Sequence, residues 1–349
     1  MAEQQPTAAA EVVQDGVVQE GVVQDSVTRR GWEIVRLTSA ELVVEVVPEL
    51  GATVCSVRRR RDDLELLHRT PWGLPRRGGP QLGGNAEVIR QDANPGGWQS
   101  LFPNGGDTVV VQGADQGYDG EARIAYFEPI DDPDQADHPG RLRLHARMRR
   151  SPLTMTKIIT LDGSSVTIEE IVRNVGTGER ELMWGTSLQF GAPFIGPDAE
   201  LDTTANLIHP DATLHYDADY DDATPWPRTI GSDSMINLRY LPEPGAETRL
   251  AYLTDFSTGS ASITNPTLDC TVELEWDAEQ WPHLWYGLEA GETTDFPWFG
   301  TGYFLSLTPN TSWPAHGMHD ARRKTSSTIK MQADEQRSNT LTLRVGPAV

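Results

Sequence analysis

Alternating apolar and polar positions recur along most of the chain after residue 30. Residues 141–148 (RLRLHARM) alternate strictly, so that their apolar members share one face of a strand whose other face meets water. Residues 41–47 are rich in β-branched side chains and stop at Pro48, which cannot continue a hydrogen-bonded ladder. Similar composition and alternation predict further strands at 52–57, 271–276, 303–307 and 341–345.

A hairpin and the lack of a helical period set the expected fold class. Residues 156–161 and 166–172 are strand-like and flank a turn at Asp162 and Gly163. No window after residue 30 sustains the 3.6-residue period of a helix. Runs of strands without intervening helices predict an all-β fold, in which large antiparallel sheets pack as a β-sandwich. Long loops are expected at 73–96, 131–140 and 198–231.

The first 30 residues differ from the rest. Residues 11–25 repeat Val-Val-Gln every five positions, which matches neither the helix period nor the strand period. We interpret residues 1–30 as a disordered leader, with a partner-binding strand as the alternative. Residues 31–349 are expected to form a single domain, because all-β chains of this size often fold as one unit.

Charge and composition exclude several kinds of partner. The formal net charge is −22 and the pI is near 4.7, which repels phosphate backbones and argues against nucleic-acid binding. No apolar run approaches the length of a membrane span and the N-terminus lacks a secretion signal, so we expect a cytoplasmic protein without membrane contact. Cys55 and Cys270 form neither a metal-ligand spacing nor a disulfide framework. The oligomeric state stays open.

A glycine-rich stretch stands out at residues 96–107 (GGWQSLFPNGGD), and residues 117–122 (GYDGEA) follow it. Glycine inside a strand or helix costs stability, so such a stretch marks places where the backbone turns or approaches something closely. The carboxylates, amides and indole beside these glycines suit a polar ligand with an apolar face. A sugar has this character.

These two segments resemble the galactose mutarotase-like superfamily, in its aldose 1-epimerase branch. The resemblance runs from about Trp32 to the C-terminus, and implies the supersandwich fold and the interconversion of sugar anomers. In that reaction one group protonates the ring oxygen while another deprotonates the anomeric hydroxyl, and no cofactor is required. Four further segments support the resemblance, and they follow one another in the same order as in the superfamily. They are 47–52 (VPELGA), 184–194 (WGTSLQFGAPF), 297–300 (PWFG) and 308–314 (TPNTSWP).

The catalytic residues that the resemblance implies are replaced in this chain. The expected His-Gly-Glu-Ala begins here with Asp119, and the expected Trp-Gly-His-His ends in Thr186 and Ser187. The expected Glu-Pro pair begins with Thr308. Standard histidine and glutamate chemistry is therefore not expected, and other groups must carry the proton transfers.

We hypothesise that Asp119 and Glu121 are these groups. Two residues apart on a strand, they would share a face with their Cα atoms about 7 Å apart. Two carboxylates in one apolar cleft do not ionise independently, so the pKa of one rises and an acid stands beside a base. The alternative is a turn at Asp119 and Gly120, with Glu121 as a surface strand residue.

Other residues are predicted to bind the ring. Indole faces stack on the C–H faces of sugars, and amide and hydroxyl groups hydrogen-bond the sugar hydroxyls. Core packing is the alternative for the aromatic residues, and a hydrogen-bonded core position for Ser187 and Gln189, which share strand parity. Arg90 is assigned to the same rim. The predicted substrate-binding residues are Trp98, Gln99, Asn104, Ser187, Gln189, Trp285, Glu289, Trp298 and Thr308.

No metal or cofactor site is predicted. The sequence has no phosphate-cradling glycine loop, no dinucleotide motif and no zinc-type pair of Cys or His. His316 and His319 are interpreted as exposed histidines. Four further carboxylates lack the glycine and the distal Glu of a calcium loop and are interpreted as a solvated acidic loop: Asp217, Asp219, Asp221 and Asp222.

The expected function is that of an aldose 1-epimerase-like isomerase with non-standard catalytic residues. Its substrate would be a small molecule, namely a sugar, a glycoside or a sugar-like ring. One alternative is a carbohydrate-binding protein that has lost the chemistry. The other is an enzyme that uses the same cleft for an isomerisation or cyclisation step in secondary metabolism.

Overall fold

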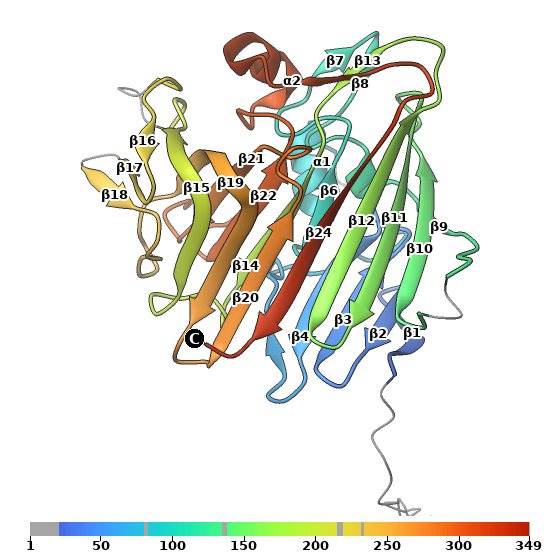
Figure 1. Ribbon diagram of the computed structural model, residues 1–349, viewed down its shortest axis with the longest axis horizontal. Helices are drawn as coiled ribbons and strands as arrows, with labels where there is room; N and C mark the ends of the chain where they lie inside the picture. Colours follow the sequence, from blue (N-terminus) through green and yellow to red (C-terminus); the bar gives the residue numbers. More distant parts are fainter. Residues whose placement is uncertain (1–20, 80–82, 135–137, 215–218, 232–233, 349) are drawn as a thin grey trace, which may run out of the picture.

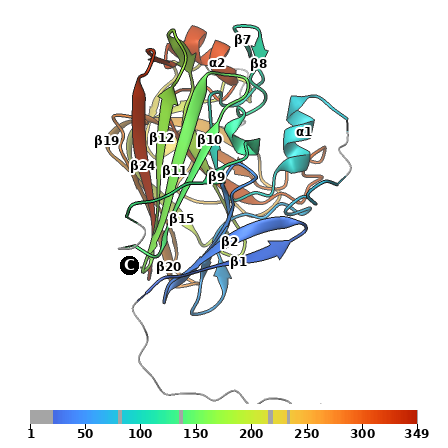
Figure 2. The ribbon, with the colours of Figure 1, turned by 90° about the vertical axis from the view of Figure 1, so that its right-hand side faces the viewer.

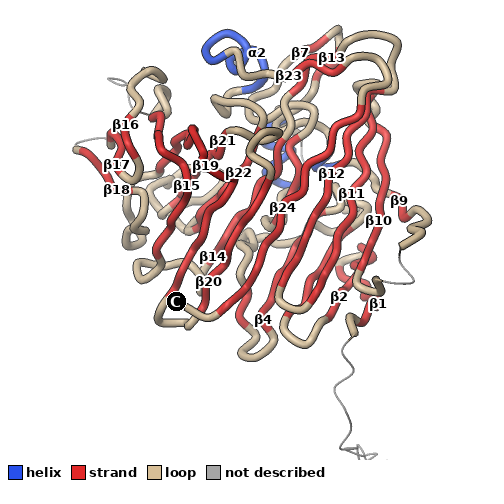
Figure 3. Tube along the Cα trace, in the orientation of Figure 1, coloured by secondary structure: helices blue, strands red, loops and turns tan. Residues whose placement is uncertain are grey.

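Strands dominate the computed structural model, which describes residues 21–79, 83–134, 138–214, 219–231 and 234–348 (Figure 3). Among these residues, 18 strands join into one continuous sheet, and the pairings between them are antiparallel. The sheet folds back on itself as two layers (Figures 1 and 2). Within the described ranges, no helix has the length and the apolar composition to cross a membrane.

The first layer is the broad one that faces the viewer in Figure 1. Its alternating strands present one apolar face to the interior, as the RLRLHARM pattern predicts. In order of pairing it contains β9 (Glu128–Pro129), β10 (Arg141–Arg147), β11 (Leu153–Asp162), β12 (Ser165–Asn174), β24 (Gln336–Gly346) and β20 (Cys270–Trp276).

The second layer lies behind the first and carries the loops and short helices. Figure 2 shows α1 (Ala86–Ala93) on the side of the molecule away from the β10–β12 layer. In order of pairing the layer contains β1 (Val23–Arg29), β2 (Trp32–Thr38), β3 (Leu42–Val47), β4 (Thr53–Arg59), β6 (Trp98–Leu101), β14 (Gly185–Gly191), β22 (Phe304–Asn310) and β21 (His283–Glu289).

One long strand, β19 (Arg249–Asn265), joins the two layers. Its residues 249–253 pair with β21 in the second layer, and its residues 259–265 pair with β20 in the first. It runs beside β15 (Glu200–Pro210), whose register shifts between Thr203 and Ala205, and such bulges bend strands.

Short elements complete the fold at its ends. They are β5 (Leu64–Glu65), β16 (Thr224–Pro225), the pairs β7 (Val110–Val111) with β8 (Ala114–Asp115), β13 (Arg180–Leu182) with β23 (Ile329–Met331) and β17 (Arg228–Ile230) with β18 (Met235–Asn237), and the helical turns η1 (Ala122–Ile124), α2 (Gly317–Asp320) and η2 (Ala321–Thr325).

A charged pair is buried between the layers. Lys157 Nζ on β11 lies 3.8 Å from Glu170 on β12 and donates to the carbonyl of Gly51 at 3.0 Å. Glu170 also accepts hydrogen bonds from Trp184 Nε1 at 2.8 Å and from Ser100. Burial lowers the pKa of Lys157, and Glu170 opposes this shift. The pair satisfies its polar atoms within an otherwise apolar core, as buried charges require.

The all-β prediction is confirmed, and each predicted strand position lies within or overlaps a strand. Two details are wrong. Residues 86–93 form a helix, because Asn85 accepts a hydrogen bond from the backbone N–H of Val88 at 2.9 Å and caps a segment too short to show a sustained period. Residues 200–210 are a strand rather than a loop, because pairing with β19 outweighs their polar composition.

The N-terminal prediction falls partly outside the described residues. Residues 1–20 lie there, and so does Asp217 of the acidic loop. From Val23 to Arg29 the chain forms β1, which pairs with β2 along its whole length. The last residues of the segment expected as a leader therefore belong to the sheet.

Candidate functional site

Four neighbouring strands place polar residues on one face of the second layer. Trp98, Leu188 and Leu307 point into the main core, so the residues that alternate with them point to the opposite face. On that face Gln99 is the direct partner of Ser187, and Thr308 Oγ1 donates to Ser187 Oγ at 2.9 Å. We call this surface the polar face; the sequence-predicted residues on it are Gln99, Ser187, Gln189, Trp285 and Thr308.

The structure places Trp98 elsewhere. Its side chain is only 2% exposed and belongs to the main core, where Nε1 donates to Thr186 Oγ1 at 2.8 Å. Because Trp98 and Gln99 are adjacent on a strand, they point to opposite faces. The core position that the sequence left as the alternative therefore describes Trp98, and its indole does not face a ligand beside Gln99.

Asp119 lies in a tight turn rather than on a strand. Its φ is +59° and that of Gly120 is +75°, and a Cβ at residue 120 would lie 2.4 Å from the carbonyl oxygen of Phe102. Asp119 Oδ1 accepts from the backbone N–H of Gly106 at 2.9 Å. The expected strand geometry is wrong here. The turn at Asp119 and Gly120 is confirmed, but Glu121, which the alternative placed on the surface, is buried.

Two arginines hold the Asp119 carboxylate. Arg90 on α1 lies 2.7 Å from Oδ2, and Arg123 on η1 contacts the same oxygen. Burial by itself raises the pKa of Asp119, but the two guanidinium groups outweigh burial and hold the pKa below its usual value. Asp119 therefore stays ionised at neutral pH.

Glu121 has a different set of partners. It directly precedes η1, and its carboxylate accepts from the backbone N–H of Arg149 at 2.8 Å, from that of Arg150 at 3.1 Å and from Ser151 Oγ at 3.2 Å. These donors belong to the connection between β10 and β11. The two carboxylates thus bind separate groups and do not share one apolar cleft.

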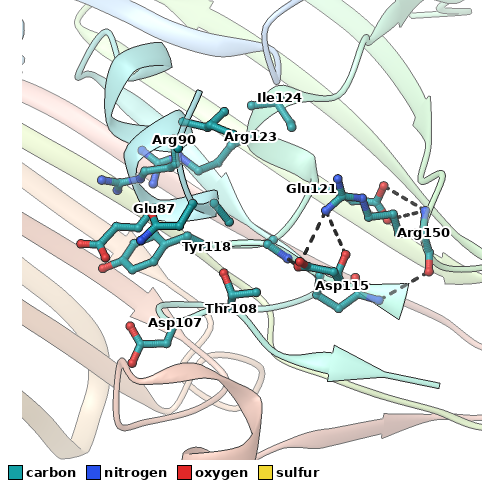
Figure 4. Close-up of a pocket in the computed structure, with 17 residues that line it drawn as sticks. Glu87, Arg90, Asp107, Thr108, Asp115, Tyr118, Glu121, Arg123, Ile124 and Arg150 are labelled. Carbon is teal, nitrogen blue, oxygen red and sulfur yellow. Dashed lines mark hydrogen bonds and ion pairs between the residues drawn. The ribbon is translucent and has the colours of Figure 1, made fainter. Parts of the chain in front are cut away.

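A cavity of about 700 Å³ lies beside this turn (Figure 4). Its walls come from the start of α1, the loop after β6, the segment before η1 and the β10–β11 connection. Arg90 lies over the Tyr118 ring at 5.1 Å. The lining residues with polar or charged side chains include Asn85, Glu87, Arg90, Asp107, Tyr118, Glu121, Arg123 and Arg150.

Arg123 joins the cavity to the polar face. Its guanidinium group contacts Asp119 and Gln99, and it lies 3.4 Å from Asn94 Oδ1. Burial lowers its pKa to about 9, and Arg90 adds to this lowering against the opposite effect of Asp119. Arg123 is not among the sequence-predicted residues, although its spacing of four residues from Asp119 was a usable signal.

Aromatic rings close one end of the polar face. His68 stacks on Phe304 with ring centroids 4.5 Å apart and meets the edge of Trp298 at 5.9 Å. Trp298 in turn stacks on Trp72 at 5.6 Å. Burial lowers the pKa of His68 to about 4, so its imidazole is neutral at physiological pH. His68 and Trp72 are not among the sequence-predicted residues, because neither lies within a family-like motif.

The remaining sequence-predicted residues anchor loops. Asn104 is fully buried; its Nδ2 donates to the carbonyls of Asp107 at 2.8 Å and Gly117 at 3.1 Å, and its Oδ1 accepts from Met318 N–H at 3.0 Å. Glu289 accepts from Thr293 Oγ1 at 2.6 Å and from the N–H of Gly291 at 3.1 Å.

Trp285 is buried and its Nε1 donates to the carbonyl of Ser312 at 2.7 Å. A Cβ at residue 105 would meet its ring at 2.7 Å, so the glycine there allows the backbone to pack on the indole. Trp285 thus supports the loop beside the polar face.

His316 is not an exposed residue, in contrast to the sequence interpretation. Its Nε2 lies 2.8 Å from Asp211 Oδ2, which also accepts from the hydroxyl of Tyr252 at 2.5 Å. Burial lowers the pKa of His316, but hydrogen bonds to Asp107 and Asp211 outweigh it and raise the pKa to about 9. His319 is exposed, as expected. The error arose because Asp211 is 105 positions away in sequence.

A family model described as a domain of unknown function, DUF4432, matches residues 140–345. The chain belongs to the DUF4432 family. The match runs from β10 to β24. It therefore covers most of the first layer of this DUF4432 protein, and β14, β21 and β22 of the second. A comparison with curated protein sequences gave no match.

Several solved structures are similar in fold to this DUF4432 protein. A Klebsiella pneumoniae protein described as a "putative aldose 1-epimerase" aligns with a TM-score of 0.69 at 13% identity, over 95% of this chain and 89% of that one. The Slr1438 protein from Synechocystis sp. PCC 6803 aligns with a TM-score of 0.62 at 16% identity, over 96% and 100%. A galactose mutarotase-like protein from Lactobacillus casei gives 0.62 at 15% identity, over 89% and 99%. The predicted galactose mutarotase-like fold is thereby confirmed.

Proposed function

We propose that this DUF4432 protein binds a sugar or a sugar-like ring on the polar face and acts there as an aldose 1-epimerase-like isomerase. The observation that carries the proposal is the convergence of Gln99, Ser187, Gln189 and Thr308 on one face. Arg123, which lines the cavity of about 700 Å³, contacts Gln99 on this face. Strand-borne hydroxyl and amide groups with flanking aromatic rings suit a polyhydroxylated ring. The fold shared with mutarotase-like proteins supports the same class of ligand.

The contacts of the two candidate proton carriers favour an anchoring role. Asp119 is held as a carboxylate by Arg90 and Arg123, and a carboxylate with a lowered pKa is a poor proton donor at neutral pH. Both oxygens of Glu121 accept hydrogen bonds from the β10–β11 connection. These contacts give weight to a second candidate function, a carbohydrate-binding protein without isomerase activity. A cytoplasmic location and a small-molecule partner belong to both candidates.

Exchange NMR with a panel of neutral aldoses separates the two. An isomerase accelerates exchange between the α and β anomers, whereas a binding protein raises its thermal midpoint with sugar but leaves the exchange rate unchanged. Asp119→Asn and Glu121→Gln variants should accompany the wild type. Retention of full exchange by both variants, once they are shown to be folded, eliminates the carboxylates as proton carriers. If no aldose shows accelerated exchange and none raises the thermal midpoint, the proposed function is contradicted.

A further inference from the structure

Two neighbouring side chains at the aromatic end of the polar face have buried polar atoms without a hydrogen-bond partner. Within the described part of the chain, neither Nε2 of His68 nor Oε1 of Gln189 has one. Each residue is 8% exposed. An unpaired buried polar atom is destabilising, so native structures seldom keep one without a reason. These two atoms belong to residues that are paired through the backbone.

Backbone pairing fixes these two side chains on the same surface. The N–H of His68 donates to the carbonyl of Gln189 at 2.7 Å, and the next residue pair, Leu67 and Phe190, forms an antiparallel bridge. Leu67 and Phe190 both belong to the main core. Paired residues in antiparallel strands share a face, so His68 and Gln189 both point away from that core and toward the polar face.

The surroundings are apolar on one side and polar on the other. Phe304 stacks on the imidazole, and Trp298, which is 7% exposed, meets it edge-on. On β22 the direct partner of Gln189 is Ser306, which is half-buried. Neutral hydrogen-bonding atoms beside indole and phenyl rings suit a ligand with hydroxyl groups on one edge and C–H groups on a face.

We infer that His68 and Gln189 form a subsite that hydrogen-bonds hydroxyl groups of a neutral sugar-like ring, with Trp298 against the apolar face of that ring. The inference rests on the proposed function and names the residues that select the ligand. Because both partners are uncharged, the subsite favours neutral aldoses over sugar phosphates and uronic acids. The neutral state of His68 follows from its burial, which lowers its pKa to about 4.

The test measures affinity for D-galactose and D-glucose, with glucose 6-phosphate and glucuronate as charged comparisons. The variants are His68→Phe, which keeps a flat ring against Phe304, and Gln189→Leu. His145→Phe on β10 is the matched control, since His145 lies in the other layer and contacts Thr156 at 2.9 Å. Thermal midpoints without sugar establish that each variant is folded. We expect about tenfold weaker binding of the neutral aldose in the first two variants and no change in the control.

Deoxy sugars distinguish a direct contact from a purely structural role of His68. A structural role would not make the loss of affinity depend on one particular sugar hydroxyl. Removing the hydroxyl that meets His68 should weaken binding to the wild type about tenfold but leave the affinity of His68→Phe unchanged. Equal affinity of wild type and both variants for the aldose would overturn the subsite while leaving the proposed function intact. The subsite would also be overturned if every deoxy sugar lost the same affinity in the wild type and in His68→Phe. If no neutral sugar binds the wild type, the proposed function fails and the subsite fails with it.

Discussion

Asp119 and Arg90 form a buried ion pair across the cavity wall, with Oδ2 and Nη2 2.7 Å apart and both side chains at most 15% exposed. Arg123 contacts the same oxygen. The family resemblance implies a catalytic histidine at position 119. In this protein Asp119 stands there and binds two arginines instead. This arrangement fixes α1 and η1 relative to the turn at Gly120, and it makes Asp119 a stability determinant.

Asp119→Asn should lower the free energy of unfolding by about 3 kcal/mol, because it leaves two buried guanidinium groups without their carboxylate. Urea unfolding followed by tryptophan fluorescence measures this. Asp63→Asn is the matched control: Asp63 also has a positive φ, +60°, and pairs with Arg58 at 2.8 Å, but its side chain is 77% exposed. We expect no measurable loss there. Equal effects of the two substitutions would contradict the anchoring role.

The buried Lys157–Glu170 pair predicts a strongly non-additive response. Lys157→Met leaves Glu170 charged inside the core and should cost about 3–5 kcal/mol of unfolding free energy. Combining it with Glu170→Leu should recover part of that loss, since no unpaired charge remains, although Ser100 and Trp184 lose an acceptor. A double-mutant cycle from urea unfolding measures the coupling. Additive losses would contradict a coupled pair.

His316 should make stability fall at alkaline pH. Its pKa is raised from 6.5 to about 9 in the folded protein, so its contribution is fully present below pH 6.5 and is lost as the pH rises through about 9. After allowance for solvent screening we expect a decrease on the order of 2 kcal/mol. His316→Gln should flatten the profile between pH 6.5 and 9. If the slope of unfolding free energy against pH is unchanged in His316→Gln, other groups cause the pH dependence.

Asp211, the partner of His316, should make stability fall at acid pH. Burial raises its pKa, but the hydrogen bond and charge of His316, together with the hydrogen bonds from Thr213 and Tyr252, outweigh burial and lower the pKa to about 2. Its contribution is therefore present above about pH 3.8 and is lost as the pH falls through about 2. Wild type and His316→Gln should consequently also differ in unfolding free energy at pH 4, where Asp211 is still ionised.

Gly106→Ala should disrupt the loop that Asp119 binds. Gly106 has a φ of +73°, and a Cβ there would lie 1.9 Å from the carbonyl oxygen of Ala315. Gly113 has a φ of +83° but open space around it, so Gly113→Ala isolates the backbone cost of about 1 kcal/mol. We expect at least twice that loss at residue 106, measured by thermal and urea unfolding. Similar midpoints for both variants would contradict the close packing of this loop on Ala315.

Much of the fold could be predicted because strand signals are local. The alternation in residues 141–148 and the turn at Asp162 and Gly163 each depend only on neighbouring residues, and β10, β11 and β12 form as expected. β15 was missed because its strand state depends on pairing with β19, about 40 residues or more away in sequence. α1 was missed because its cap at Asn85, one buried residue and the ion pair of Arg90 with Asp119 hold it, and none of these gives a helical period.

The site was less predictable, since side-chain contacts are long-range. Strand parity correctly grouped Ser187 with Gln189, and the motifs located Gln99 and Thr308 on neighbouring strands. The same parity argument failed for Asp119 and Glu121, because a positive φ at residue 119 replaces the strand by a turn. No local pattern connects His68 with Gln189, or His316 with Asp211.

Filling the polar face tests the central claim most directly. Ser187→Trp puts a bulky side chain beside Thr308, and Thr167→Trp on β12 of the other layer is its control. The measurement is the rise in thermal midpoint that saturating neutral aldose produces in each folded protein. We predict a rise in the wild type and in Thr167→Trp and none in Ser187→Trp. An equal rise in all three would contradict ligand binding on the polar face.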